Sequence, residues 1–277
     1  MGDDTVGDSW YSDNRDWWDE KVPLHVGGEF YRVREFLEGE EQLRPFEIEE
    51  LGDVSGRTLF HPQCHFGQDT LCWARHGAVV TGLDFSPAAV DAATKLAADA
   101  GITDSRFVCA DVYDAFDAVG GARFDVVYTG LGAINWLHDI HRWAATMAAV
   151  CRPGGTLYLA EFHPFAAMFD DERTDGALVP RYDYFGHEWH DTSDTYTGSY
   201  GAQDAATEFN DTHERVWTVG EVVTALIGAG FGLEFLHEHE FTLYDSLRFL
   251  VRTERGYELP DGLPRIPMMY SLRATRR

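Results

Sequence analysis

The strongest constraint on the fold is a regular alternation of short apolar runs and longer helix-forming runs between residues 57 and 162. The apolar runs predict strands, and the runs between them predict helices. Ser86 and Pro87 have the residue types that favour the N-cap and first position of one such helix. Strands joined by helices form a parallel sheet with helices on both faces. The predicted strands are 57–61, 78–83, 106–109, 124–128 and 156–162, and the predicted helices are 68–76, 87–100 and 139–150.

The alternation breaks after Pro164, where residues 165–216 mix Asp, Thr, Tyr, Phe, Gly and His. We interpret this segment as an insertion with strand-like pieces near 181–185 and 195–200. The alternation then resumes, and it predicts a helix at 219–229 and strands at 233–240 and 268–274.

The N-terminal segment has a different character. Residues 1–13 are polar and acidic and are expected to be poorly ordered. Residues 14–50 alternate aromatic and charged residues, which predicts two or three short helices. We therefore divide the chain into an N-terminal helical lid, 1–50, and one α/β domain, 51–277, which carries the insertion at 165–216.

The net charge is strongly negative, because 47 Asp and Glu residues stand against 22 Lys and Arg, giving −25. Among the basic residues only Lys21 and Lys95 are lysines. Such a surface repels nucleic acid phosphates and anionic membranes, so neither is an expected partner. Acid-rich, lysine-poor composition resembles that of proteins from salt-accumulating halophiles. An ordinary acidic protein has the same signature, and both interpretations stay open.

The sequence also predicts a location. It contains no 18-residue apolar run, and its first residues, Met1 to Asp4, lack a hydrophobic signal region. We therefore expect a cytoplasmic protein. The four cysteines form no C-x-x-C pair, which favours reduced thiols over a disulfide framework or a zinc site.

Five motifs follow one another along the alternation. They are the loop Gln63-Cys64-His65-Phe66-Gly67-Gln68-Asp69-Thr70-Leu71, the segments Gly82-Leu83-Asp84-Phe85-Ser86, Cys109-Ala110-Asp111 and Phe124-Asp125-Val126-Val127-Tyr128, and the turn Arg152-Pro153-Gly154-Gly155. A Pro-Gly-Gly turn alone suits any place where the backbone needs positive φ. Its weight comes from standing after the other four in this order.

The order and spacing of these motifs resemble the class I, Rossmann-like S-adenosylmethionine-dependent methyltransferases, and the resemblance covers residues 14–277. It implies a seven-stranded, mostly parallel sheet with helices on both faces, whose antiparallel last strand lies beside the fifth. It also implies S-adenosyl-L-methionine as the cofactor. The implied reaction moves a methyl group to an O, N or C atom of a small organic acceptor.

The loop after the first strand departs from the family pattern. Methyltransferases of this class usually have an acidic residue followed by G-x-G-x-G. Here His61 stands at the acidic position, Gln63 and His65 stand at the first two glycine positions, and only Gly67 remains. The run from Gln63 to Leu71 nevertheless resembles the same run of one methyltransferase subgroup. A Gln63 side chain is able to accept from the cofactor's ammonium and to donate to its carboxylate.

The other expected cofactor contacts follow the next strands. The resemblance places Asp84 on the ribose diol and Phe85 on the adenine face. It places Asp111 on the adenine amino group with Val112 alongside. The main chain at Thr129 and Gly130 is expected to lie against the methionine part of the cofactor.

An NAD(P)-dependent oxidoreductase shares this topology and remains as an alternative, as does a binding protein that keeps the cofactor site without catalysis. A dinucleotide site uses G-x-G-x-x-G to seat a pyrophosphate on a helix N-terminus. This chain lacks that motif and carries the side chains of Gln63 and His65 where the phosphate would lie. The loop therefore favours a sulfonium nucleoside over a dinucleotide.

Several residues are candidates for the acceptor side of the site. His163 follows the fifth predicted strand and is a candidate general base. A role in orienting a loop or the cofactor is favoured over it, because methyl transfer often needs no strong base. Asn135 and Trp136 follow the fourth strand. The aromatic and imidazole side chains expected to line the acceptor pocket or its lid are Trp18, His25, Tyr31, Trp136 and Tyr182.

The histidines of the insertion, His187, His190 and His213, have no helical i,i+4 spacing, and no metal site is expected from them. The strand-forming residues of 165–216 also permit a dimerisation arm, so a homodimer is the alternative to an acceptor pocket there. The sequence does not indicate which small molecule accepts the methyl group.

Overall fold

The computed structural model describes residues 4–185, 187–191, 198–199, 201–202 and 205–277. Its centre is a seven-stranded sheet with the strand order β3-β2-β1-β4-β5-β12-β8. The first five strands are parallel, and β12 pairs antiparallel with both β5 and β8. This arrangement confirms the predicted fold class, including the antiparallel last strand beside the fifth. The strands are β1 (Thr58–Pro62), β2 (Val79–Asp84), β3 (Arg106–Cys109), β4 (Phe124–Thr129), β5 (Cys151–Phe162), β8 (Phe231–His239) and β12 (Met269–Arg276).

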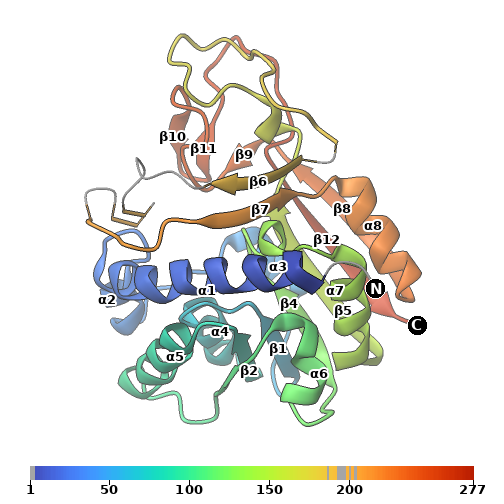
Figure 1. Cartoon of the computed structure of the whole chain (residues 1–277). Helices are drawn as coiled ribbons and strands as arrows, with labels where there is room; N and C mark the ends of the chain where they lie inside the picture. Colours follow the sequence, from blue (N-terminus) through green and yellow to red (C-terminus); the bar gives the residue numbers. More distant parts are fainter. Residues whose placement is uncertain (1–3, 186, 192–197, 200, 203–204) are drawn as a thin grey trace.

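Helices cover both faces of this sheet (Figure 1). Each face has its own apolar core. One core joins Phe36, Leu51, Trp73 and Leu96 to the sheet. These residues lie on α2 (Val33–Leu37), α3 (Pro45–Leu51), α4 (Gln68–Arg75) and α5 (Pro87–Asp99). The other core involves α6 (Ala115–Ala118), α7 (Ile140–Val150), α8 (Val219–Gly228) and the short 3-10 helix η1 (Val112–Asp114).

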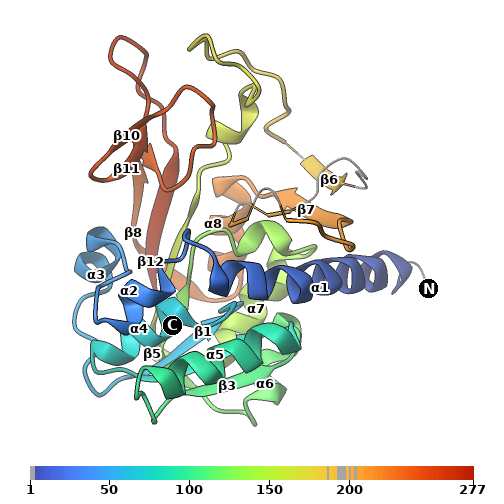
Figure 2. The ribbon, with the colours of Figure 1, turned by 90° about the vertical axis from the view of Figure 1, so that its left-hand side faces the viewer.

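The N-terminal segment differs from its prediction. One long helix, α1, spans Asp4–Gly27, where a poorly ordered stretch and the start of the short helices were predicted. The short helices predicted further along are confirmed by α2 and α3. Tertiary contacts explain its length: buried Trp10 donates from Nε1 to the Trp136 carbonyl at 2.9 Å, and Asn14 Nδ2 donates to the His213 carbonyl at 2.8 Å. In both ribbon views α1 lies between the insertion and α5 (Figures 1 and 2).

The insertion forms the hairpin of β6 (His187–Asp191) and β7 (Thr212–Val216), preceded by a 3-10 turn η3 (Ala166–Met168). The strand predicted at 181–185 is wrong, because those residues form bends without strand pairing. The piece predicted at 195–200 lies mostly outside the described residues. A small sheet of β9 (Phe241–Thr242), β10 (Val251–Thr253) and β11 (Gly256–Glu258) was not predicted.

The Pro-Gly-Gly turn also differs in detail from the expected helix, turn and strand. Strand β5 starts directly after α7, with Cys151 paired to Phe124, and the ladder resumes at Thr156 opposite Val126. The residues between form an irregular excursion in which Gly154 has φ 76°. A Cβ on Gly155 would lie 2.8 Å from Cys151 Sγ, so the second glycine is needed for close approach.

Within the described part of the chain, no helix is long and apolar enough to cross a bilayer.

Candidate active site

The candidate site lies where the parallel strands end. Pro62 ends β1, Asp84 ends β2, Cys109 ends β3, Thr129 ends β4 and Phe162 ends β5. The strand order reverses between β1 and β4, because the chain winds outward from β1 to β3 before it crosses to β4. In open α/β sheets, ligands bind outside the carboxyl ends of the strands at such a switch point. The predicted cofactor residues are brought together around this edge.

The loop after β1 has the positive φ angles typical of glycine at two residues that are not glycines. Gln63 has φ 54° and His65 has φ 51°, and Gly67 follows with φ 73°. A left-handed conformation costs an ordinary residue about 1–2 kcal/mol. Gln63 and His65 stand at the first two of the three glycine positions in the family pattern. The loop therefore preserves the turn at the expense of strain, which is common at functional sites.

Gln63 reaches from this loop to the loop after β4. Its Nε2 donates to the Ala133 carbonyl at 2.8 Å. Its Oε1 is buried and has no hydrogen-bond partner among the described residues, and the same holds for Thr129 Oγ1. Buried polar atoms are normally paired, so unpaired ones require an explanation. Both atoms are available to a ligand at the ends of β1 and β4.

Asp84 is buried at the end of β2 and connects the loop after β1 with the turn that leads into α5. Its Oδ2 accepts from the His65 amide at 2.7 Å, and its Oδ1 accepts from the Ser86 amide at 3.0 Å. Burial raises its pKa to about 6, against the lowering effect of these two amides. Each carboxylate oxygen retains capacity for a further donor.

His61 occupies the position where the family pattern has an acid. Its ring is buried, its Nδ1 lies 2.8 Å from Thr70 Oγ1, and burial lowers its pKa to about 4. The imidazole is therefore neutral at pH 7. A Cβ on Gly130 would lie 3.3 Å from His61 Nε2, so the main chain after β4 passes close to this ring.

The residues expected near adenine flank β3. Asp111 caps η1 by accepting from the Tyr113 amide at 2.8 Å, and burial raises its pKa. Val112 is buried beside it. Phe85 packs edge-on against Tyr11 of α1, with ring centroids 5.6 Å apart. Helix α1 thus closes over the ends of β2 and β3.

Glu161 is a site residue that sequence reasoning missed. Its carboxylate accepts from the amides of Gly132, Ala133, Ile134 and Phe162 at 2.7 to 3.2 Å. Burial raises its pKa to about 7, while those amides favour the ionised form. Glu161 therefore holds the loop after β4 in place. A single carboxylate inside the apolar run of β5 was the available signal.

His163 has both ring nitrogens engaged. Its Nδ1 accepts from the Phe165 amide at 3.1 Å, and its Nε2 lies 3.1 Å from Glu238 Oε1. Burial lowers its pKa, although Glu238 opposes the shift. With no free lone pair on the ring, the geometry favours the loop-orienting role over the general base.

An aromatic and imidazole cluster covers the loop after β1. Trp18 of α1 packs against His65 and Trp136, with ring centroids at 4.8 and 5.2 Å. His25 Nδ1 lies 2.9 Å from His65 Nε2, and His25 also bonds Ser199 of the insertion. Burial lowers the pKa of His25 to about 4 and that of His65 well below its usual value. Tyr31 packs on both imidazoles.

The remaining predicted acceptor residues lie in two places. Asn135 donates to Glu214 of β7 at 2.7 Å, which ties the loop after β4 to the hairpin. Tyr182 donates to Asp171 at 3.0 Å and lies against Arg181, both within the insertion.

Comparison with known proteins bears on this geometry. Residues 61–159, which contain the loop and the ends of β2, β3 and β4, match a family described as a methyltransferase domain. This part of the chain is therefore similar to a methyltransferase domain. The sequence is similar to a ubiquinone biosynthesis O-methyltransferase of Methylobacterium sp. (strain 4-46), with 32% identity over 147 residues, 52% of this chain and 57% of that protein. The corresponding enzyme of Coxiella burnetii (strain RSA 493) is 26% identical over 149 residues, 53% of this chain and 56% of that protein.

The chain thus spans little more than half the length of these curated relatives. Among solved structures, the fold is similar to an S-adenosylmethionine-dependent methyltransferase from Mesorhizobium loti, with TM-score 0.59, 22% identity, and coverage of 87% of this chain and 100% of that one. It is also similar to a glycopeptide N-methyltransferase solved with S-adenosylmethionine, with TM-score 0.53, 18% identity, and coverage of 90% and 95%. At these identities the structural matches support the methyltransferase fold.

Proposed function

We propose that this protein transfers a methyl group from S-adenosyl-L-methionine to an O, N or C atom of a small organic acceptor. The observation that carries the proposal is the strained loop after β1. Its Gln63 Oε1 is a buried acceptor without a described partner, and its His65 amide donates to the Asp84 carboxylate. The matched methyltransferase domain covers this same loop. Relatives named O-methyltransferases support the reaction class.

The chemistry of the site fits the cofactor's donors. S-adenosylmethionine presents donors at its ammonium, its ribose diol and its adenine amino group. We assign Gln63 Oε1 and the Thr129 and Gly130 main chain to the ammonium, Asp84 to the diol, and Asp111 to the amino group. Phe85 and Val112 would lie on the adenine faces, and His61 would lie uncharged under the methionine end.

The same chemistry disfavours a dinucleotide. A pyrophosphate needs amide donors or cations, whereas Asp84 and Asp111 are carboxylates and Gln63 presents an oxygen. The neutral His61 and His65 supply no positive charge. These residues therefore favour a methyltransferase over an NAD(P)-dependent oxidoreductase.

When bound, S-adenosylmethionine supplies an electrophilic methyl group on a sulfonium. The protein's part is to hold the acceptor in line and to exclude water. We assign this part to Trp18 and Tyr31, which pack against His65 in the loop after β1, and to Trp136, which packs against Trp18. The imidazoles of His25 and His65 are weak bases here, so we infer that positioning carries more of the rate than proton removal.

The proposal is tested by calorimetric titration of the protein with S-adenosylhomocysteine and with NADH, followed by a turnover assay with a labelled methyl donor and a panel of small acceptors. We expect S-adenosylhomocysteine to bind, NADH not to bind, and label to reach at least one acceptor. Asp84→Ala should weaken S-adenosylhomocysteine binding about 10- to 100-fold, because two charge-assisted hydrogen bonds are lost. The matched control, Asp104→Ala, changes an exposed acid away from the strand ends and should leave affinity unchanged.

Three results would count against the proposal. NADH binding in place of S-adenosylhomocysteine would indicate a dinucleotide enzyme. Undiminished affinity in Asp84→Ala would remove Asp84 from the site. Cofactor binding without label transfer to any acceptor of a broad panel would favour the non-catalytic binding protein.

A further inference from the structure

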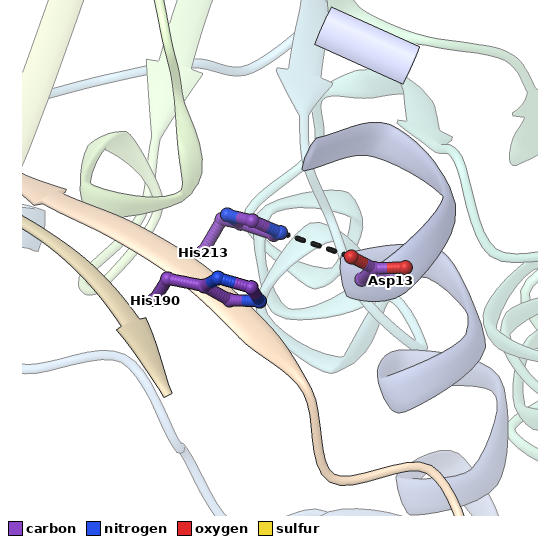
Figure 3. Close-up of side chains that lie close together, drawn as sticks. All are labelled: Asp13, His190 and His213. Atoms are coloured by element: carbon purple, nitrogen blue, oxygen red, sulfur yellow. Dashed lines mark hydrogen bonds and ion pairs between the residues drawn. The ribbon is translucent and has the colours of Figure 1, made fainter. Parts of the chain in front are cut away.

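Three side chains with metal-binding atoms converge between α1 and the hairpin of the insertion. Asp13 comes from α1, His190 from β6 and His213 from β7, and one ligand atom of each lies within 4.8 Å of the other two (Figure 3). The two histidines stand directly opposite each other in the β6–β7 register. Directly opposed residues of an antiparallel pair have neighbouring side chains on one face, so the hairpin itself brings the imidazoles together.

The cluster has a defined geometry. The His190 and His213 rings are stacked, with centroids 4.0 Å apart and an interplanar angle of 13°. His213 Nε2 lies 2.9 Å from Asp13 Oδ2. Figure 3 shows both rings side by side, with the His213 nitrogen directed at the Asp13 carboxylate.

Neighbouring residues hold one of the three ligands, His213, in place. Asn14 donates to the His213 carbonyl and accepts from the His213 amide, each at 2.8 Å. Trp10 stacks on the His213 ring with centroids 5.3 Å apart. The His213 side chain is 12% exposed and that of Asp13 31% exposed, whereas His190 is exposed to solvent. The cluster is therefore partly preorganised, with one ligand free to adjust and a route for an ion to enter.

We propose that Asp13, His190 and His213 bind one divalent transition-metal ion of the Zn²⁺ type, which clips α1 to the β6–β7 hairpin. Imidazole nitrogen suits Zn²⁺ and its neighbours in the transition series, whereas Mg²⁺ and Ca²⁺ prefer all-oxygen sites. Two nitrogens and one carboxylate oxygen leave a fourth tetrahedral position for water. With metal–ligand bonds of about 2.0–2.2 Å, ligand atoms lie about 3.3–3.5 Å apart, so a small closure around the ion completes the site.

The ion would act on the arrangement of the lid rather than on methyl transfer. Asp13 lies one turn from Trp10 and close to Trp17, and these side chains contact Trp136 at the loop after β4. A clip at Asp13 therefore fixes the covering helix and the hairpin that meet over the strand ends. The inference does not depend on the identity of the reaction. Its ligands are far apart in sequence, which is why spacing alone gave no metal signal.

The test uses the full-length protein without an affinity tag, stripped of metal with a chelator and titrated with ZnCl₂ in a calorimeter. We expect saturable binding of one Zn²⁺ per chain, a higher melting temperature with Zn²⁺, and no such rise with MgCl₂. His190→Ala should weaken Zn²⁺ binding at least about tenfold, since even loss of a residue that only supports a ligand costs about 10- to 100-fold. Loading with Co²⁺ should give visible d–d absorption bands in the native chain and not in His190→Ala.

Two controls distinguish a metal site from the Asp13–His213 hydrogen bond alone. His141→Ala removes an exposed histidine on α7 and should leave Zn²⁺ affinity unchanged. His190→Ala spares the Asp13–His213 pair, so its melting temperature without metal should match that of the native chain. Absence of saturable binding, or binding that His190→Ala and His141→Ala alter equally, would overturn the proposal and leave a stacked histidine beside a hydrogen-bonded Asp13–His213 pair.

Discussion

At Asp84, burial favours the protonated carboxyl, whereas the proposed binding of the ribose favours the ionised one. Burial raises the pKa of this carboxyl to about 6, whereas acceptance of two ribose hydroxyls requires the ionised form. As the pH falls below about 6 the ionised fraction drops, by about tenfold per unit once well below the pKa. We expect the affinity for S-adenosylhomocysteine to be constant from about pH 8 to pH 7 and to fall through pH 6 and 5.

Calorimetric titrations across this range test the expectation. Asp84→Asn should bind weakly at every pH and lose most of the dependence, with the remainder due to Asp111, whose pKa is also raised. His25 and His61, with pKa values lowered to about 4, stay neutral over the whole range. An affinity that is independent of pH in the native protein would argue that Asp84 does not hold the ligand.

Gln63 offers a second residue-scale prediction, because it combines a strained backbone with a proposed ligand contact. Gln63→Gly relieves a left-handed conformation that costs about 1–2 kcal/mol. It also removes the hydrogen bond to Ala133, worth about 0.5–1.5 kcal/mol. We expect little change in the free energy of unfolding but roughly tenfold weaker S-adenosylhomocysteine binding.

Gln63→Ala is the matched variant, since it keeps the strain and loses the same contacts. Chemical denaturation should show it to be less stable than Gln63→Gly by about 1 kcal/mol, with similar loss of affinity. Equal stability of the two variants would show that the backbone at residue 63 carries no strain.

At the scale of elements, β5 organises the loop after β4 through one side chain. Glu161 accepts four main-chain amides, three of them from residues 132–134. In Glu161→Gln, one accepting oxygen is replaced by a donating NH₂ group, which leaves buried amides unpaired. We expect a loss of about 1–3 kcal/mol in the free energy of unfolding, measured by denaturant titration.

S-adenosylhomocysteine binding should weaken in the same variant, because the loop also holds Gln63 through Ala133. Glu49→Gln changes an exposed glutamate and serves as the control. If Glu161→Gln unfolds like the native protein and like Glu49→Gln, the loop does not rely on this carboxylate.

The elements that sequence predicted well are those whose signal is local. Alternating apolar runs and the Ser86 cap located the core strands and helices to within a few residues, apart from the start of β5. The length of α1 was missed because Trp10 and Asn14 are stabilised by residues about 120 to 200 positions away. Strands β6 and β7 and the short β9–β11 sheet depend on pairing across loops, which no short pattern reveals.

The residues of the candidate site likewise divide into those that the local sequence predicts and those that depend on tertiary contacts. Asp84 and Asp111 were readable because each follows a strand in a fixed order. Gln63 and His65 were placed by position, but only the structure shows that they retain glycine-like φ values. Glu161 and the Asp13–His190–His213 cluster arise from tertiary contacts, and residue order does not predict them.

For the whole molecule, the charge of −25 predicts a dependence on salt. Repulsion between surface carboxylates is largely screened beyond the Debye length, which is about 10 Å at 0.1 M and about 3 Å at 1 M. If the acidic surface is a halophilic adaptation, the melting temperature should rise by several degrees between low salt and about 2 M KCl. An unchanged melting temperature in calorimetric scans would favour an ordinary acidic protein.

The central claim is that S-adenosylmethionine binds at the carboxyl edge of the sheet, and a crystal structure of the protein with S-adenosylhomocysteine tests it most directly. The account predicts the ribose hydroxyls on Asp84, the adenine amino group on Asp111 and the ammonium within hydrogen-bonding distance of Gln63 Oε1. Density for the ligand at another edge of the sheet, or at this edge without contact to Asp84 and Gln63, would contradict it.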